Sequence, residues 1–126
     1  MLTEQDIRQA LRDCYDPEIP LNVVDLGLVL DIQLALDPDA PGFGIPGVPL
    51  KQNLNLLMLP TTEDESAQAQ MRAQVANRLA GLPELSRITV HLEEGGGWTP
   101  ARISAEGRRT LGLDQPQFPI LNNRLR

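Results

Sequence analysis

From Leu28 to Leu36, every second residue is leucine or isoleucine, and the positions between them are mostly polar or small. This period of two over nine positions predicts a strand with one buried face. A second alternation, with apolar residues at 54, 56 and 58, predicts another strand over residues 54–59. Between them, residues 37–50 contain four prolines and three glycines and predict a loop. That loop is long for a hairpin connection, so it either has a function or is tolerated as surface.

Helical signals surround these strands. Thr3 and Asp6 approximate a capping box, and an apolar stripe at i, i+3, i+4 and i+7 predicts a helix over residues 3–14. A second helix is predicted to begin with Thr62 as N-cap and Glu65 in the capping-box position, and to end at Gly81. Residues 88–92 alternate as a third strand. A last short helix begins at either Thr99 or Ser104 and stops at Gly112. The apolar stripe of the first helix consists of Ile7, Ala10, Leu11 and Cys14, and that of the second consists of Ala67, Met71, Val75 and Leu79.

This order of helix, strand, strand, helix, strand, helix predicts an α+β fold. We expect a compact two-layer single domain over residues 1–112, with a small mixed sheet of about three strands packed against helices. The connection through the second helix fits a right-handed crossover between parallel strands. Residues 113–126 carry two prolines and are predicted to form an irregular C-terminal tail.

Composition excludes several classes of function. The net charge of −6 on 126 residues disfavours binding to nucleic acid, because an acidic surface repels phosphates. No apolar run is long enough for a membrane span, and no signal peptide is visible, so we expect no membrane partner and a cytoplasmic location. Cys14 is the single cysteine, which rules out an internal disulfide and a four-thiolate zinc site.

Two sequence blocks point to a family. Residues 15–29 read YDPEIPLNVVDLGLV, and residues 98–112 read WTPARISAEGRRTLG. The first block resembles the DPEIP-x-N-[IV]-x-DLGL signature of the small iron–sulfur cluster assembly domain of SufT-like and PaaD-like proteins, and the second resembles the ending of the SufT-like branch. The resemblance covers residues 3–112 and implies an α+β fold. It also implies a non-enzymatic role in the maturation of iron–sulfur proteins, as a cluster carrier or as an adaptor.

The resemblance also implies a reactive cysteine just after the second strand, but residues 59–66 of this chain contain none. Carboxylates bind cluster iron more weakly than soft thiolates do. We therefore expect no stably bound cluster and no metal ligands. The alternative is a cluster bridged between two chains by two copies of Cys14, although its apolar stripe predicts that this thiol is buried.

Three groups of residues are candidates for partner binding: Asp16, Glu18, Asn22 and Asp25; Thr62, Glu63 and Asp64; and Trp98, Arg102 and Arg108. The first group contains carboxylates that could instead serve acid–base chemistry, a hard metal ion or local turns of the backbone. The second group is either a set of charges at a helix start or a binding edge where the family places its cysteine. The third group could anchor a partner, since tryptophan and arginine are frequent hot-spot residues, or its tryptophan could simply cover the core.

No catalytic residues are predicted, because we find no nucleophile–base spacing, phosphate loop or metal motif. His91 is expected to point outward from its strand into solvent. The favoured hypothesis is an adaptor that contacts the iron–sulfur assembly machinery or recipient proteins. The alternative is a diverged binding module or small subunit of another complex. Residues 101–126 are basic and residues 1–100 are acidic, so the chain could also pair head to tail as a homo-oligomer or bind an acidic protein.

Overall fold

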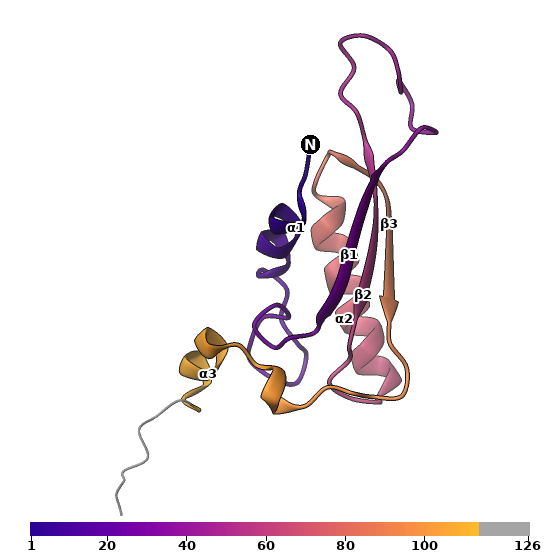
Figure 1. Cartoon of the computed structure of the whole chain (residues 1–126). Helices are drawn as coiled ribbons and strands as arrows, with labels where there is room; N and C mark the ends of the chain where they lie inside the picture. The colour runs from indigo at the N-terminus through magenta and orange to yellow at the C-terminus, as the bar shows by residue number, and fades with distance from the viewer. Residues whose placement is uncertain (114–126) are drawn as a thin grey trace, which may run out of the picture.

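A mixed sheet of three strands forms one layer of the molecule, and the helices lie to one side of it, as Figure 1 shows. The computed structural model describes residues 1–113. Strands β1 (Val29–Leu36) and β2 (Gln52–Met58) pair antiparallel, and β2 pairs parallel with β3 (Leu85–Leu92), in the order β1-β2-β3. The predicted α+β fold with a small mixed sheet is confirmed.

Helix α1 (Glu4–Leu11) begins with the predicted capping box: the Thr3 hydroxyl accepts a hydrogen bond from the Asp6 N–H, and the Asp6 carboxylate accepts one from the Thr3 N–H. It ends three residues earlier than predicted, because Asp13 and Cys14 donate backbone hydrogen bonds to carbonyls only three residues back. Cys14 nevertheless continues the apolar stripe and is 0% exposed, so its predicted burial is confirmed.

Helix α2 (Glu65–Ala80) packs against the sheet through the four predicted apolar residues. The predicted N-cap was wrong. Asp64 caps the helix by accepting a 3.0 Å hydrogen bond from the Ala67 N–H, while the Thr62 hydroxyl accepts one from the Asp64 N–H. The Asp64 carboxylate is favoured there because it meets the positive end of the helix dipole, and Thr62 instead closes the turn before the helix.

The strands differ from the prediction at their ends. The pairing register of β1 shifts between Val29 and Asp31, so Leu28 and Val29 are both buried and the alternation is regular only from Asp31 on. Leu36 was expected on the buried face but is 42% exposed. Strand β3 starts at Leu85, three residues before the predicted start, because β2 extends back to Gln52 and pairs with it. His91 points outward, as predicted.

Both alternative starts of the last helix are used. A single 3₁₀ turn, η1 (Pro100–Arg102), follows Thr99, and helix α3 (Ala105–Leu111) begins after Ser104, whose hydroxyl accepts a hydrogen bond from the Gly107 N–H. Gly112 ends α3 with φ of 77°, as the sequence predicted. The predicted irregular tail lies outside the described residues from position 114 on. Within residues 1–113, no helix is long and apolar enough to cross a membrane.

Candidate functional site

The two sequence blocks, residues 15–29 and 98–112, pack directly on each other. The indole N–H of Trp98 donates a 2.6 Å hydrogen bond to the Leu26 carbonyl, and the Arg102 side chain donates one of 2.8 Å to the Gly27 carbonyl. Gly27 has φ of 76°, and a Cβ placed on it would lie 2.4 Å from the Arg102 carbonyl oxygen. Only glycine combines that conformation with so close an approach. The blocks therefore form one structural unit.

Asp25 joins three segments of this unit. Its carboxylate accepts hydrogen bonds from Arg12 at 3.1 Å, from the Asn22 amide at 2.7 Å and from the Ser104 hydroxyl at 2.9 Å. Burial alone would raise the pKa of Asp25, but the hydrogen bonds from Asn22, Ser104 and Arg12 and the charge of Arg12 outweigh it and lower this pKa. Asp25 is therefore an ionised cross-link between α1, the first block and the start of α3.

Asp16 organises the turn that follows α1. One of its carboxylate oxygens accepts hydrogen bonds from the N–H groups of Glu18 and Ile19, each at 2.8 Å. The other accepts a 2.8 Å hydrogen bond from the Thr61 hydroxyl, just beyond β2. Asp16 thus fixes the proline-containing turn against residues that line the hollow described next.

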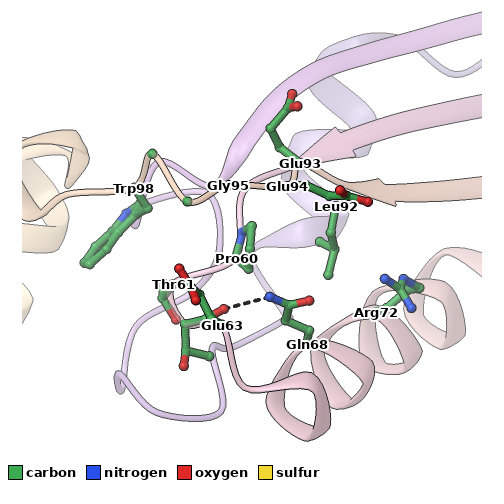
Figure 2. A pocket seen from close by; sticks show the side chains of 13 residues that line it. Pro60, Thr61, Glu63, Gln68, Arg72, Leu92, Glu93, Glu94, Gly95 and Trp98 are labelled. Carbon is green, nitrogen blue, oxygen red and sulfur yellow. Dashed lines mark hydrogen bonds between the residues drawn. The ribbon is translucent and has the colours of Figure 1, made fainter.

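A hollow of about 510 Å³ opens at the carboxyl ends of the parallel strands β2 and β3. Figure 2 shows its two sides, the turn leading into α2 and the loop leading from β3 toward η1. Open α/β sheets commonly bind ligands at this end of their parallel strands. The amide of Gln68 donates a 2.8 Å hydrogen bond to the Thr62 carbonyl and fixes the first side. On the other side, the consecutive glycines 95–97 all have positive φ and carry no side chain over the opening.

The charge around the hollow is predominantly negative. Glu63, Glu93 and Glu94 line it, and Arg72 is the one basic residue among its lining. Within residues 1–113, none of these four side chains forms an ion pair. Their charges are therefore available to an incoming molecule.

The lining of this hollow does not fit an iron–sulfur cluster. No cysteine or histidine is among its lining residues, and cluster iron is held by thiolates. Cys14 lies elsewhere, fully buried, with its thiol 4.0 Å from the Gln74 carbonyl. Burial raises the pKa of this thiol, an effect that nearby Asp13 adds to and Arg78 reduces. Across residues 1–113, no three His, Cys, Asp or Glu side chains lie together in a way that could hold a metal ion.

The structure brings some predicted candidates together and separates others. Thr62, Glu63 and Trp98 line the hollow, with Asp64 next to them as the cap of α2. The buried residues of the first group act through internal hydrogen bonds, and only Glu18 of that group is exposed. Arg102 and Arg108 bond to the carbonyls of Gly27 and Pro100. A direct role of these residues in partner binding stays a prediction.

Sequence reasoning missed the acidic side of the hollow. Glu93 and Glu94 directly follow β3 and directly precede three glycines, and that pattern was the available signal. No sequence pattern indicated that Arg72 lines the hollow, because its position there depends on how α2 packs across the sheet.

Comparisons with known proteins find relatives that are named as Fe-S protein maturation factors. Residues 4–37 match the family described as iron–sulfur cluster assembly protein, and this match includes the first block. In this region the chain is therefore similar to iron–sulfur cluster assembly proteins. The chain is 27% identical over 111 residues to the Fe-S protein maturation auxiliary factor YitW of Bacillus subtilis, and this match covers 87% of the chain and 94% of YitW.

Two further relatives complete the comparison. An Fe-S protein maturation auxiliary factor of Porphyromonas gingivalis is 54% identical over 35 residues, a match that covers 28% of the chain and 33% of that relative. The chain therefore matches about a third of the length of that protein. A crystal structure of a domain of unknown function from Bacillus anthracis superposes with a TM-score of 0.67 at 24% identity, over 87% of this chain and 92% of the other. That similarity shows a shared fold.

Proposed function

We propose that this chain is an accessory protein in the maturation of iron–sulfur proteins, and that it acts in the cytoplasm by protein–protein contact without catalysing a reaction. The observation that carries the proposal is the relation to YitW, which runs over nearly the whole of both chains. The match of residues 4–37 to the iron–sulfur cluster assembly family supports the same role.

The proposed contact surface is the hollow at the ends of β2 and β3. Its rim carries Glu63, Glu93 and Glu94, which suit a basic surface on the assembly machinery or on a recipient protein. Trp98 stands at one end of the hollow and offers a large, partly apolar surface held in place by its hydrogen bond to Leu26. The packed sequence blocks act as the rigid support of this surface.

In this proposal the chain works without a stably bound cluster. The hollow lacks thiols, and two copies of Cys14 could bridge a cluster only if the packing around this buried residue opened. Anaerobic reconstitution with iron and sulfide, followed by visible absorption and iron counting, tests this on the wild type and on Cys14→Ala. We expect no cluster on either chain. A cluster that forms on the wild type and is lost in Cys14→Ala would replace the adaptor role with that of a carrier.

The adaptor role is tested in the organism that produces this chain. Without the chain, we expect the activity and iron content of iron–sulfur enzymes such as aconitase to fall while the amount of enzyme protein stays constant. The wild type should restore activity and the double variant Glu93→Lys/Glu94→Lys should not. Glu106→Lys is the matched control, because Glu106 is exposed on α3 and does not line the hollow. Unchanged enzyme activity in the absence of the chain would refute the proposal.

The absence of cysteine from residues 59–66 favours one second candidate, a diverged binding module or small subunit of another complex. In that case the chain would copurify with a stable complex that contains no iron–sulfur protein or assembly factor. Removing the chain would then leave iron–sulfur enzymes at full activity.

A further inference from the structure

The loop between β1 and β2 carries the largest group of exposed apolar side chains in the described part of the molecule. It projects well beyond the sheet, as Figure 1 shows. Of the eight large hydrophobic residues that are exposed within residues 1–113, five belong to this loop or to the strand end that leads into it. We call them the apolar tip: Leu36, Phe43, Ile45, Val48 and Leu50, which are 38–56% exposed. A concentration of exposed apolar surface in one place indicates an interaction site.

The loop is ordered by its own hydrogen bonds. The N–H groups of Phe43, Ile45 and Val48 each donate to the carbonyl three residues back, at 3.0–3.1 Å, and form a series of turns. Gly42, with φ of 86°, lies so close to Val48 that a Cβ on it would be 2.5 Å from a Val48 methyl group. The backbone that carries the apolar side chains is thus ordered before any contact forms, which lowers the entropy lost on binding.

The base of the loop is attached to the rest of the fold. The buried carboxylate of Asp37 accepts a 2.6 Å hydrogen bond from the Ser86 hydroxyl at the start of β3, and this bond is the main reason that the pKa of Asp37 is lowered. Lys51 donates a 2.6 Å hydrogen bond to the Pro83 carbonyl. The apolar tip therefore projects from a fixed base.

The charge pattern identifies what this tip can contact. Residues 40–50 contain no charged side chain in a protein whose net charge is −6. Two copies of the chain repel each other over most orientations, and contact through the neutral tip brings the fewest like charges together. Lys51 is the one basic residue among residues 37–51, and a single positive charge does not make the basic segment that would attract an anionic membrane.

The remaining surface favours a symmetric contact. Within residues 1–113, the other exposed large hydrophobic residues are Met1, Tyr15 and Leu113, which lie on separate segments and form no second patch to receive the tip. A head-to-tail assembly needs such a second patch, whereas a two-fold dimer uses the same patch on both copies. We propose that two copies of this chain meet tip to tip through the apolar tip. This contact does not depend on the proposed function.

Because only five side chains contribute, the contact is smaller than a standard stable interface, and the dimer should be weak and concentration-dependent. Sedimentation velocity of the full chain from low to several hundred micromolar should show a shift from 13.9 kDa toward twice that mass. In Phe43→Ser/Ile45→Ser we expect the association constant to fall by about a hundredfold, which is about tenfold for each substituted position, counted over both copies of the two-fold dimer. Leu113→Ser, at a residue 52% exposed outside the tip, is the matched control and should dimerise normally.

A crosslinking test gives a positive signal. In the background Cys14→Ala, Ile45→Cys should form a disulfide-linked dimer under mild oxidation much faster than Leu113→Cys does. A wild type that stays monomeric at the highest concentration would overturn the proposal, and so would a dimer that Phe43→Ser/Ile45→Ser leaves intact. Flotation with phosphatidylcholine vesicles tests the alternative partner, a lipid surface. A monomer that binds vesicles through the tip would assign this loop to a lipid surface and not to a second copy of the chain.

Discussion

Residues 1–113 contain two aspartate–arginine pairs of the same chemistry in opposite surroundings, and they predict different losses of stability. The side chain of Asp25 is 8% exposed and bonds to Arg12, Asn22 and Ser104, whereas the side chain of Asp13 is 65% exposed and bonds only to Arg78 among residues 1–113. Replacing each aspartate by alanine compares a buried cross-link with a surface ion pair.

The magnitude follows from the groups left behind. Asp25→Ala removes the acceptor for the buried Asn22 amide and for the Ser104 hydroxyl, and each donor left unsatisfied costs about 1–3 kcal/mol. Arg12 regains contact with water, because its side chain is 39% exposed, and adds little. The expected loss in free energy of unfolding is therefore about 3 kcal/mol for Asp25→Ala. For Asp13→Ala it is about 0–1 kcal/mol, the range for exposed pairs.

Urea unfolding followed by fluorescence measures both losses. Trp98 is the single tryptophan, and its indole N–H bonds to the Leu26 carbonyl beside Asp25, so its emission reports on this region directly. Far-ultraviolet circular dichroism checks that the whole domain unfolds in the same transition. Equal losses for the two variants, or a loss below about 1 kcal/mol for Asp25→Ala, would refute the assignment of Asp25 as the central cross-link.

Three further predictions concern single groups. Gly27→Ala should lower the free energy of unfolding by about 2–4 kcal/mol, because positive-φ strain adds to the clash with Arg102. Gly96 has φ of 82° and no atom within 4 Å of an added Cβ, so Gly96→Ala should lower it by only about 1–2 kcal/mol, from strain alone. Equal losses in the same urea assay would contradict the clash. Cys14 should react with a thiol reagent at neutral pH far more slowly in the folded chain than in urea, because it is buried and its pKa is raised, and equally fast labelling would show that it is accessible. Because the pKa of Asp25 is lowered on folding, its ionised form stabilises the fold fully above the unfolded pKa of about 3.9, and this stabilisation is lost as the pH falls through the folded pKa. The difference in free energy of unfolding between wild type and Asp25→Asn should therefore shrink below about pH 4. A difference that stays constant with pH in urea unfolding would argue against this role of Asp25.

Elements whose signals are local could be predicted from the sequence. The buried stripe of α2, the capping box at Thr3 and the end of α3 at Gly112 depend on residues within a few positions of one another. The N-cap of α2 was harder, because Thr62 and Asp64 both have suitable side chains and three-dimensional placement decides between them.

The candidate site depends on contacts distant in the sequence. The hollow forms because the turn after β2 and the loop after β3 meet at one edge of the sheet, and that meeting follows from parallel pairing. Periodicity alone cannot assign Asp16 to the Thr61 hydroxyl or Trp98 to the Leu26 carbonyl, which are separated by 45 and 72 residues. Residue type singled out Asp16 and Trp98, but only the fold gives them partners.

The packing of the two sequence blocks has a consequence for folding during synthesis. The Leu26 carbonyl, the Gly27 carbonyl and the Asp25 carboxylate receive hydrogen bonds from residues 72, 75 and 79 positions later in the chain. While the ribosome makes the sheet and α2, the two carbonyls have only water or transient partners, and the Asp25 carboxylate has only Arg12 and Asn22 of its three side-chain partners. A nascent chain that stops before Trp98 therefore lacks these closing contacts, and we expect it to be the form most susceptible to proteolysis. The last helix completes the fold only after nearly the entire domain has left the ribosome.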